Sequence, residues 1–255
     1  MAKRLSALEL FNALQHQSNW PSGGAPVVLD CRASSKRIIR GSHRVRLDGD
    51  SVEVVGASRS WRGRDVCLVD ESPDGLVDHP VARALLKSGE CRELFVLSDS
   101  FDAFYDRFRC LCAKESSSKA SKRQPMPSCI LPNLLYLGDL ADAAALPRLR
   151  EQLNIQTCLT ALAELPPSLK AAVAESGVSH TWCNVRDVEE ANIKEHFAKA
   201  HEMIEAARKA GTAIFIHCSR GVSRSASLCI AYLMKAEKME AQRAREVPCA
   251  AEPAP

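Results

Sequence analysis

Short apolar runs alternate with segments of helical periodicity over the first 112 residues of the chain. The runs at 26–30, 65–70 and 93–98 consist mostly of Val, Leu and Phe, as buried strands do. Between and after them, segments 5–16, 80–88 and 101–112 have the pattern of helices. Strands that are apolar throughout and separated by helices predict a parallel sheet covered on both faces.

The same alternation resumes after a polar interval. Residues 113–127 are rich in Ser, Lys and Pro with almost nothing to bury, which predicts a linker. Strands are then expected within 130–138 and at 155–162, 180–184 and 214–217, with helices at 149–153, 168–175, 193–207 and from 225 to about 234. The pattern therefore predicts an α/β protein with two domains, residues 1–112 and 128–255, joined by a linker at 113–127.

Composition narrows the class of protein. The chain has 255 residues, is 46% hydrophobic and 25% charged, and carries a net charge of +3, as soluble globular proteins do. That charge is too small to indicate nucleic acid as a partner, and no apolar run approaches the ~18 residues that a membrane helix needs. The eleven cysteines form no C-x-x-C pairs, so we expect no metal site, no cofactor and no disulfide framework. Reduced cysteines favour the cytoplasm, with the nucleus second and a mitochondrial presequence a lesser alternative.

The most informative stretch is the run from Ile214 to Ser225, an apolar strand followed by a Gly-containing loop and a helix. In such a loop the amides, the positive end of the helix and the planar fork of Arg224 can together hold an anion. The same field would stabilise Cys218 as a thiolate. The alternative is a structural Cys that ends a core strand, with a helix N-cap at Ser223. The predicted phosphate-binding residues are Ser219, Arg220, Gly221, Val222, Ser223 and Arg224.

This run resembles the His-Cys-x5-Arg-Ser signature of the cysteine-dependent protein phosphatases, most closely the dual-specificity group. The resemblance implies that Cys218 attacks phosphorus, Arg224 binds the phosphoryl oxygens and Ser225 assists the thiolate. It gives His217 an orienting role, although a hydrogen-bonded core histidine would fit equally well. Residues 130–138, Ile-Leu-Pro-Asn-Leu-Leu-Tyr-Leu-Gly, are similar to the first strands of the same group.

The resemblance places the general acid at Asp187, on the segment after the predicted strand 180–184. The alternatives are a helix N-cap or a surface carboxylate. The compact size of the second domain suits a shallow pocket that accepts phosphotyrosine and phosphoserine or phosphothreonine. Lipid phosphatases of the superfamily often have more basic loops; here Arg220 is followed by the apolar Val222, so a phosphoprotein substrate is preferred over a phosphoinositide.

Dual-specificity domains usually continue with two more helices, whereas here only a short tail follows Pro248. The catalytic domain is therefore expected to be C-terminally shortened, with exposed apolar surface and a looser loop. This leaves open a rival of another class, a pseudophosphatase similar to the STYX-like proteins that binds phosphoproteins or kinases without turnover. Retention of Cys218 favours the enzyme.

The first domain resembles a rhodanese-like domain at Leu29-Asp-Cys-Arg32 and at 97–101 followed by Phe104 and Phe108. A sulfurtransferase needs a Cys in an amide-lined loop after a strand. The equivalent loop, 70–75, has no Cys and contains three acidic residues, so we expect a non-catalytic domain. Cys31 and Cys67 are expected to serve in packing.

A basic cluster lies in segment 36–46. MAP kinase phosphatases resemble this chain in joining a rhodanese-like domain to a phosphatase domain, and they use a basic and apolar patch there to bind a kinase. A solvated charged loop is the alternative that the pattern favours, because charge runs are weak evidence of binding. The basic residues are Lys36, Arg37, Arg40, Arg44 and Arg46. A second candidate for such a patch consists of Arg59, Arg62 and Arg64.

Overall fold

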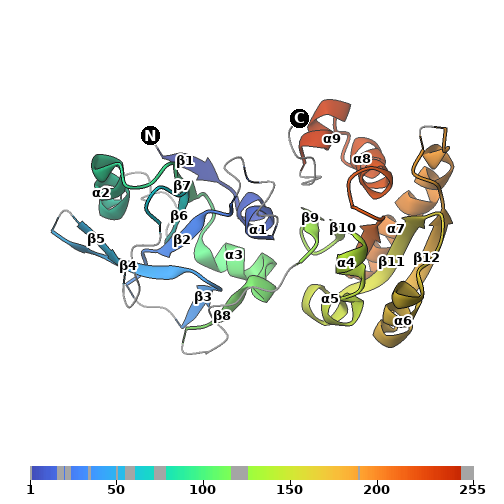
Figure 1. Cartoon of the computed structure of the whole chain (residues 1–255), viewed down its shortest axis with the longest axis horizontal. Coiled ribbons are helices and arrows are strands. Elements are labelled where there is room, and N and C mark those ends of the chain that lie inside the picture. Colours follow the sequence, from blue (N-terminus) through green and yellow to red (C-terminus); the bar gives the residue numbers. More distant parts are fainter. Residues whose placement is uncertain are drawn as a thin grey trace. The chain divides into compact units, whose positions relative to one another are not determined.

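The computed structural model describes residues 2–15, 20, 24–33, 36–49, 51–54, 61–71, 79–115, 126–188 and 190–247. The chain divides into two compact units, Met1–Gln124 and Pro125–Pro255, and each contains its own sheet with helices (Figure 1). The prediction of an α/β protein with two domains is thus confirmed. No described helix is long and apolar enough to span a bilayer.

The first unit is built on a sheet with the strand order β1-β7-β6-β2-β4-β5. All neighbouring pairs are parallel except β4 with β5. Its three central strands are buried along their whole length, which explains their continuous apolar sequences. The strands are β1 (Lys3–Leu5), β2 (Val27–Asp30), β4 (His43–Asp48), β5 (Ser51–Val54), β6 (Val66–Val69) and β7 (Leu94–Leu97).

Helices α1 (Ala7–Gln15), α2 (Pro80–Ser88) and α3 (Phe101–Arg107) belong to this unit. The side chain of Ser100 accepts a hydrogen bond from the Ala103 amide and so caps the start of α3. The helix expected over 101–112 is shorter than predicted, because α3 ends at Arg107 and a single 3-10 turn (Arg109–Leu111) follows.

Segment 36–46 does not form the expected charged loop. Strand β3 (Arg37–Ile39) pairs antiparallel with β8 (Cys112–Lys114), and the rest of the segment lies largely in β4. Strand β8 also takes up the first residues of the predicted linker, and residues 116–125 lie outside the described part of the chain. Strands β3 and β4 can contain arginines because each of them has one side exposed to solvent.

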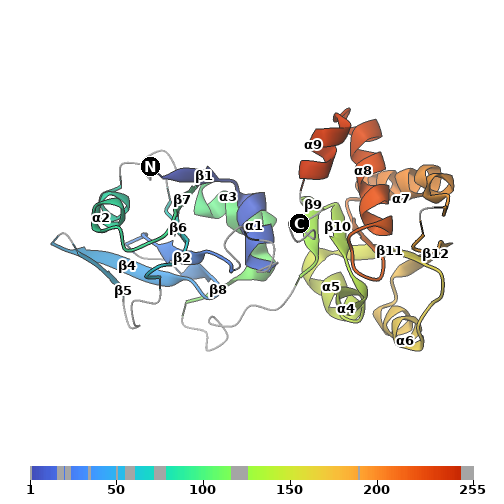
Figure 2. The same cartoon turned by 45° about the horizontal axis from the view of Figure 1, so that its top comes forward.

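The second unit has the strand order β12-β11-β13-β10-β9, parallel except for β9 with β10. Figure 2 shows α4, α5 and α6 on one side of this sheet and α7, α8 and α9 on the other. The strands are β9 (Ser128–Leu131), β10 (Leu135–Gly138), β11 (Ile155–Leu162), β12 (Ser179–Asn184) and β13 (Ala213–His217). The helices are α4 (Leu140–Ala143), α5 (Leu146–Leu153), α6 (Pro167–Ser176), α7 (Phe197–Ala210), α8 (Arg224–Ala236) and α9 (Ala241–Glu246).

Strand β13 lies between β11 and β10 and is buried at every residue. Because its neighbours run parallel to it, the carboxyl ends of three strands meet at one edge of the sheet, where loops of α/β proteins form binding sites. The segment after β13 begins with Cys218 at this edge. Helix α9, which sequence periodicity did not predict, buries Ala244 in the core that also contains Leu228 and Tyr232 of α8.

Candidate active site

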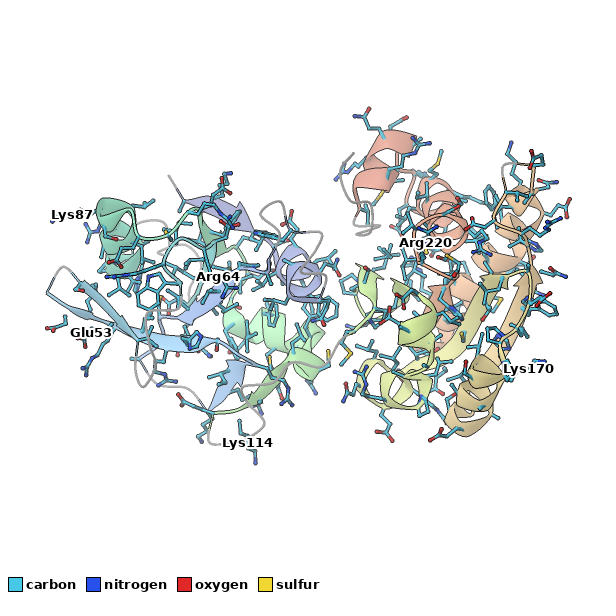
Figure 3. All side chains as sticks on the ribbon, viewed as in Figure 1. Glu53, Arg64, Lys87, Lys114, Lys170 and Arg220 are labelled. Carbon is cyan, nitrogen blue, oxygen red and sulfur yellow. The ribbon has the colours of Figure 1, made fainter. Side chains whose placement is uncertain are left out.

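The loop between β13 and α8 curls tightly at Gly221. This glycine has φ +75°, a conformation that disfavours other residues, and a Cβ there would lie 2.9 Å from the carbonyl oxygen of Gly138 at the end of β10. Gly221 itself is buried, whereas Ser219, Arg220 and Ser223 are exposed and Val222 is half-buried. Figure 3 labels Arg220 on this loop. The loop is therefore seated on the neighbouring strand, with several of its side chains at the surface.

Two carbonyl groups of the loop are bound from outside it. The Leu140 amide donates to the carbonyl oxygen of Ser219 at 3.3 Å, and His217 Nδ1 lies 3.3 Å from the carbonyl oxygen of Cys218. On the inner side, the Gly221 amide donates to Cys218 Sγ at 3.2 Å. Carbonyls that are held outward leave amides facing inward, which is the arrangement of an anion-binding nest.

Cys218 is buried, with 2% of its surface exposed, and is surrounded by hydrogen-bond donors. Ser225 Oγ, in the first turn of α8, donates to Sγ at 3.1 Å. Burial alone would raise the pKa of the thiol, but the Ser225 hydroxyl and the amides of Ser225, Arg220 and Gly221 together bring the pKa below its ordinary value. The sequence prediction that the loop stabilises a thiolate agrees with this balance.

Other cysteines show the opposite behaviour. Burial raises the pKa of Cys67, Cys112 and Cys158 to about 12, and burial together with Asp70 raises that of Cys31. These thiols stay protonated near neutral pH and fill space as small apolar groups. The contrast is local in origin, because Cys218 sits where several donors converge.

Arg224 extends from the start of α8 toward the segment after β12. Its Nη1 donates to the carbonyl oxygen of Val185 at 3.3 Å, and its Nη2 forms an ion pair with Asp187 Oδ2 at 3.2 Å. The Arg224 side chain is buried, and its Nε has no hydrogen-bond partner among the described residues. A buried donor without a partner is costly, so an added anion that reached Nε would satisfy it.

Asp187 is brought to the site by this ion pair, although its side chain is 48% exposed. It lies in a bend and not at the start of a helix, so the N-cap alternative does not apply. Ser223 does occupy the N-cap position of α8, but its side chain makes no capping hydrogen bond. The structure thus gathers Cys218, Ser225, Arg224 and Asp187 around one loop.

His217 is fully buried, and burial lowers its pKa to about 4, which keeps the ring neutral near neutral pH. Its Nε2 lies 2.7 Å from Thr160 Oγ1, which is also 2.9 Å from His180 Nε2. Sequence reasoning missed both partners. Thr160 carried a usable signal, since it is the one polar residue in the buried run 158–162 of strand β11. Among the described residues, no group of three or more His, Cys, Asp or Glu side chains could hold a metal ion.

Comparisons with known proteins agree with this geometry. Residues 135–247 match the family described as "Dual specificity phosphatase, catalytic domain". Dual specificity protein phosphatase 1 of Mus musculus is 27% identical over 187 residues, covering 65% of this chain and 49% of the relative. Dual specificity protein phosphatase 4 of Homo sapiens is 28% identical over 277 residues, covering 89% of this chain and 68% of the relative.

Two further matches extend the comparison. A probable rhodanese domain-containing dual specificity protein phosphatase of Dictyostelium discoideum is 30% identical over 167 residues, which are 64% of this chain and 34% of the relative. The crystal structure of human DUSP28 is 26% identical, covers 52% of this chain and 87% of that chain, and has a TM-score of 0.44. The chain spans about half the length of the first curated relatives it matches. Residues 135–247 therefore match the catalytic domain of the dual specificity phosphatases, and over this region the chain is similar to proteins of that family.

Proposed function

We propose that this chain hydrolyses phosphate monoesters of proteins, on tyrosine and on serine or threonine, through a cysteinyl-phosphate intermediate. The observation that carries the proposal is the convergence of a Cys218 thiol of lowered pKa and the buried Arg224 guanidinium on one amide-lined loop. A nucleophile and an oxyanion clamp in that arrangement suit phosphoryl transfer.

In the first step the phosphate enters the loop and accepts hydrogen bonds from the inward amides and from Arg224, whose Nε is available for it. The phosphate takes the place of the Asp187 carboxylate at Arg224. Cys218 Sγ then bonds to phosphorus, the bond from phosphorus to the ester oxygen breaks, and Asp187 protonates the departing alcohol.

In the second step water attacks the cysteinyl phosphate. Asp187, now a carboxylate, takes a proton from the water as its oxygen bonds to phosphorus, and the bond from sulfur to phosphorus breaks. Cys218 leaves as a thiolate, which the Ser225 hydroxyl and the Gly221 amide stabilise at 3.1 and 3.2 Å. Inorganic phosphate departs, and Arg224 pairs with Asp187 again.

The proposal is tested by turnover of an aryl phosphate by purified protein, run beside a thermal melt. We expect Cys218→Ser to abolish turnover while the protein stays folded, because an alcohol at this position is not ionised near neutral pH. Turnover near the wild-type rate in Cys218→Ser would refute the assignment. A wild-type protein that is folded but inactive would instead support the binding-only alternative, which retention of Cys218, Arg224 and Asp187 disfavours.

We further propose that the rhodanese-like first unit is non-catalytic and uses segment 36–46 to bind an acidic surface of a MAP kinase. Lys36 and Arg37 are exposed at the start of the segment, and the Arg37 guanidinium lies 4.2 Å from the ring centroid of Tyr105. Two other arginines are already engaged by carboxylates at 3.0 Å, Arg44 by Glu115 and Arg46 by Glu53. The exposed end around Arg37 is therefore the better contact for a partner.

The binding proposal is tested by pull-down of a purified MAP kinase. The variant in which Arg37 and Arg40 are replaced by Glu should lose the kinase, since two reversed charges repel an acidic surface. Arg83→Glu is the control, because this exposed arginine lies in α2, outside both basic clusters. Equal capture by the double variant and the wild type would refute the assignment.

A further inference from the structure

A series of hydrogen-bonded side chains runs through the sheet behind Cys218. His217 Nδ1 lies 3.3 Å from the carbonyl oxygen of Cys218, and His217 Nε2 lies 2.7 Å from Thr160 Oγ1. The same hydroxyl oxygen lies 2.9 Å from His180 Nε2. This series of hydrogen bonds thus connects the edge strand β12 with the peptide group of the nucleophile.

The register of three strands brings these side chains together. Thr160 of β11 pairs directly with His217 of β13, so their side chains share one face of the sheet. His180 of β12 pairs with Cys158, two residues before Thr160 and on the same face. Such diagonal neighbours on adjacent strands lie within reach of a ring as long as imidazole. Thr160 and His217 are fully buried, whereas His180 is half-buried.

The direction of each hydrogen bond follows from what each atom can do. A carbonyl oxygen only accepts, so His217 Nδ1 must carry the hydrogen that faces Cys218. The buried ring is neutral near neutral pH, and its Nε2 therefore has a lone pair and accepts from Thr160. Thr160 has a single hydroxyl hydrogen, which it donates to His217 Nε2 in this bond.

The outer bond is then determined as well. With its hydrogen directed at His217, the Thr160 oxygen can only accept from His180, so His180 Nε2 carries a hydrogen. If His180 accepted instead, Thr160 would turn its hydrogen outward and His217 Nε2 would have to donate. A neutral His217 would then place the Nδ1 lone pair against the carbonyl oxygen of Cys218 at 3.3 Å, which is repulsive.

We propose that Thr160 and His180 are positioning residues for the nucleophile. His180 sets the direction of the Thr160 hydroxyl, the hydroxyl holds His217 in the form protonated at Nδ1, and His217 keeps the Cys218 carbonyl turned outward. If the carbonyl were released, it could turn its negative end toward the thiolate and move the Gly221 amide away from Sγ. This inference rests on the proposed function, because it concerns how Cys218 is kept reactive.

A plain structural role for the same three residues would have a different signature. Buried polar groups need partners, and removing one destabilises the fold whichever atom of each hydrogen bond is the donor. A structural role therefore predicts a lower melting temperature with no change at Cys218. The positioning role predicts a change in the tautomer of His217 and in the pKa of the Cys218 thiol.

The first experiment measures the tautomer of His217 from the ¹⁵N chemical shifts of its ring. The expected result is a hydrogen at Nδ1 in the wild type and in His180→Gln, because the Gln amide nitrogen can still donate to Thr160. His180→Leu has no donor, and there we expect the hydrogen to redistribute toward Nε2. A wild-type ring protonated at Nε2, or an unchanged tautomer in His180→Leu, would overturn the proposal.

The second experiment measures the pKa of Cys218 from the pH dependence of its alkylation by iodoacetate. Thr160→Val should raise this pKa by about one unit, the effect of moving one donor, the Gly221 amide, away from Sγ, and Thr160→Ser should restore it. Thr157→Val, on the same strand, is the matched control. If Thr160→Val does not fold, His180→Leu at the half-buried end gives the same readout, and an unshifted pKa in the folded variant refutes the idea. Neither readout needs turnover, so failure of the hydrolase proposal would be seen separately.

Discussion

Ser225→Ala tests how the loop maintains a thiolate. Ser225 Oγ donates to Cys218 Sγ at 3.1 Å, and burial of both groups limits the access of solvent that could replace the lost donor. A hydrogen bond to a charged group contributes about 1.5–3 kcal/mol. One pKa unit corresponds to about 1.4 kcal/mol, so the variant should raise the pKa of Cys218 by about one to two units.

The assay is the rate of iodoacetate alkylation over a series of pH values, read beside kcat/KM for an aryl phosphate. For Ser225→Ala, both the alkylation rate and kcat/KM should fall at neutral pH, because less of the thiol is ionised, and both should recover at higher pH. Ser227→Ala is the matched control, because Ser227 lies in the same helical turn but donates to the Ser223 carbonyl oxygen at 2.9 Å and not to sulfur. Its thiol pKa should equal that of the wild type.

The stability of Ser225→Ala should also depend on pH. A Cys218 pKa that is lower in the folded state than its ordinary value of 9.0 stabilises the fold fully above pH 9, and this contribution is lost as the pH falls through the folded value. The deficit of the variant should therefore be greatest at high pH. An unchanged thiol pKa in folded Ser225→Ala would refute the view that this hydroxyl stabilises the thiolate.

Two further variants test other parts of the site. Gly221→Ala should lower the melting temperature and kcat/KM, because the new Cβ would lie 2.9 Å from the Gly138 carbonyl oxygen. Gly211→Ala is the control: Gly211 has φ +65° and its Cβ would meet nothing within 4 Å, so this variant should show only the backbone strain of about 1–2 kcal/mol and keep the thiol pKa. Equal effects of the two substitutions would contradict the steric explanation. Burial and Asp139 raise the pKa of Asp142 to about 6 from 3.8, so the folded state loses stability as the pH rises through this window. Asp142→Asn should therefore be more stable than the wild type in urea unfolding above pH 6 and no more stable below pH 4, and a deficit at every pH would show that its capping bond to Asp139 dominates.

Much of the fold was predictable because buried parallel strands have a strong apolar signal. The strand expected over 155–162 is β11 as observed, and the helix expected over 80–88 is α2. The strands that were missed are short or charged: β1 consists of Lys-Arg-Leu with one buried residue, and β3 begins with an exposed arginine. Tertiary pairing, and not local pattern, makes these segments strands. Helix α9 was not predicted because its apolar signal is weak: of its residues whose burial the structure describes, only Ala244 is buried.

The candidate site was predictable where its residues are neighbours in sequence. The loop from Cys218 to Arg224 needs only a strand, a glycine and a helix start, all of which are local features. The ion pair between Arg224 and Asp187 joins two separate segments, and the contact of Thr160 with His217 depends on strand order and register. Neither property can be derived from one sequence, because periodicity reports which face of an element is buried and not which element covers it.

The most direct measurement of the central claim is detection of the phosphorylated intermediate. The Asp187→Ala variant should be mixed with an aryl phosphate, whose leaving group needs little protonation, and quenched in acid before peptide mapping by mass spectrometry. Without the Asp187 carboxylate to activate water, the intermediate should accumulate with one phosphoryl group on the peptide that contains Cys218. Release of phosphate with no phosphoryl group on Cys218, or with the group on another residue, would contradict the proposed mechanism.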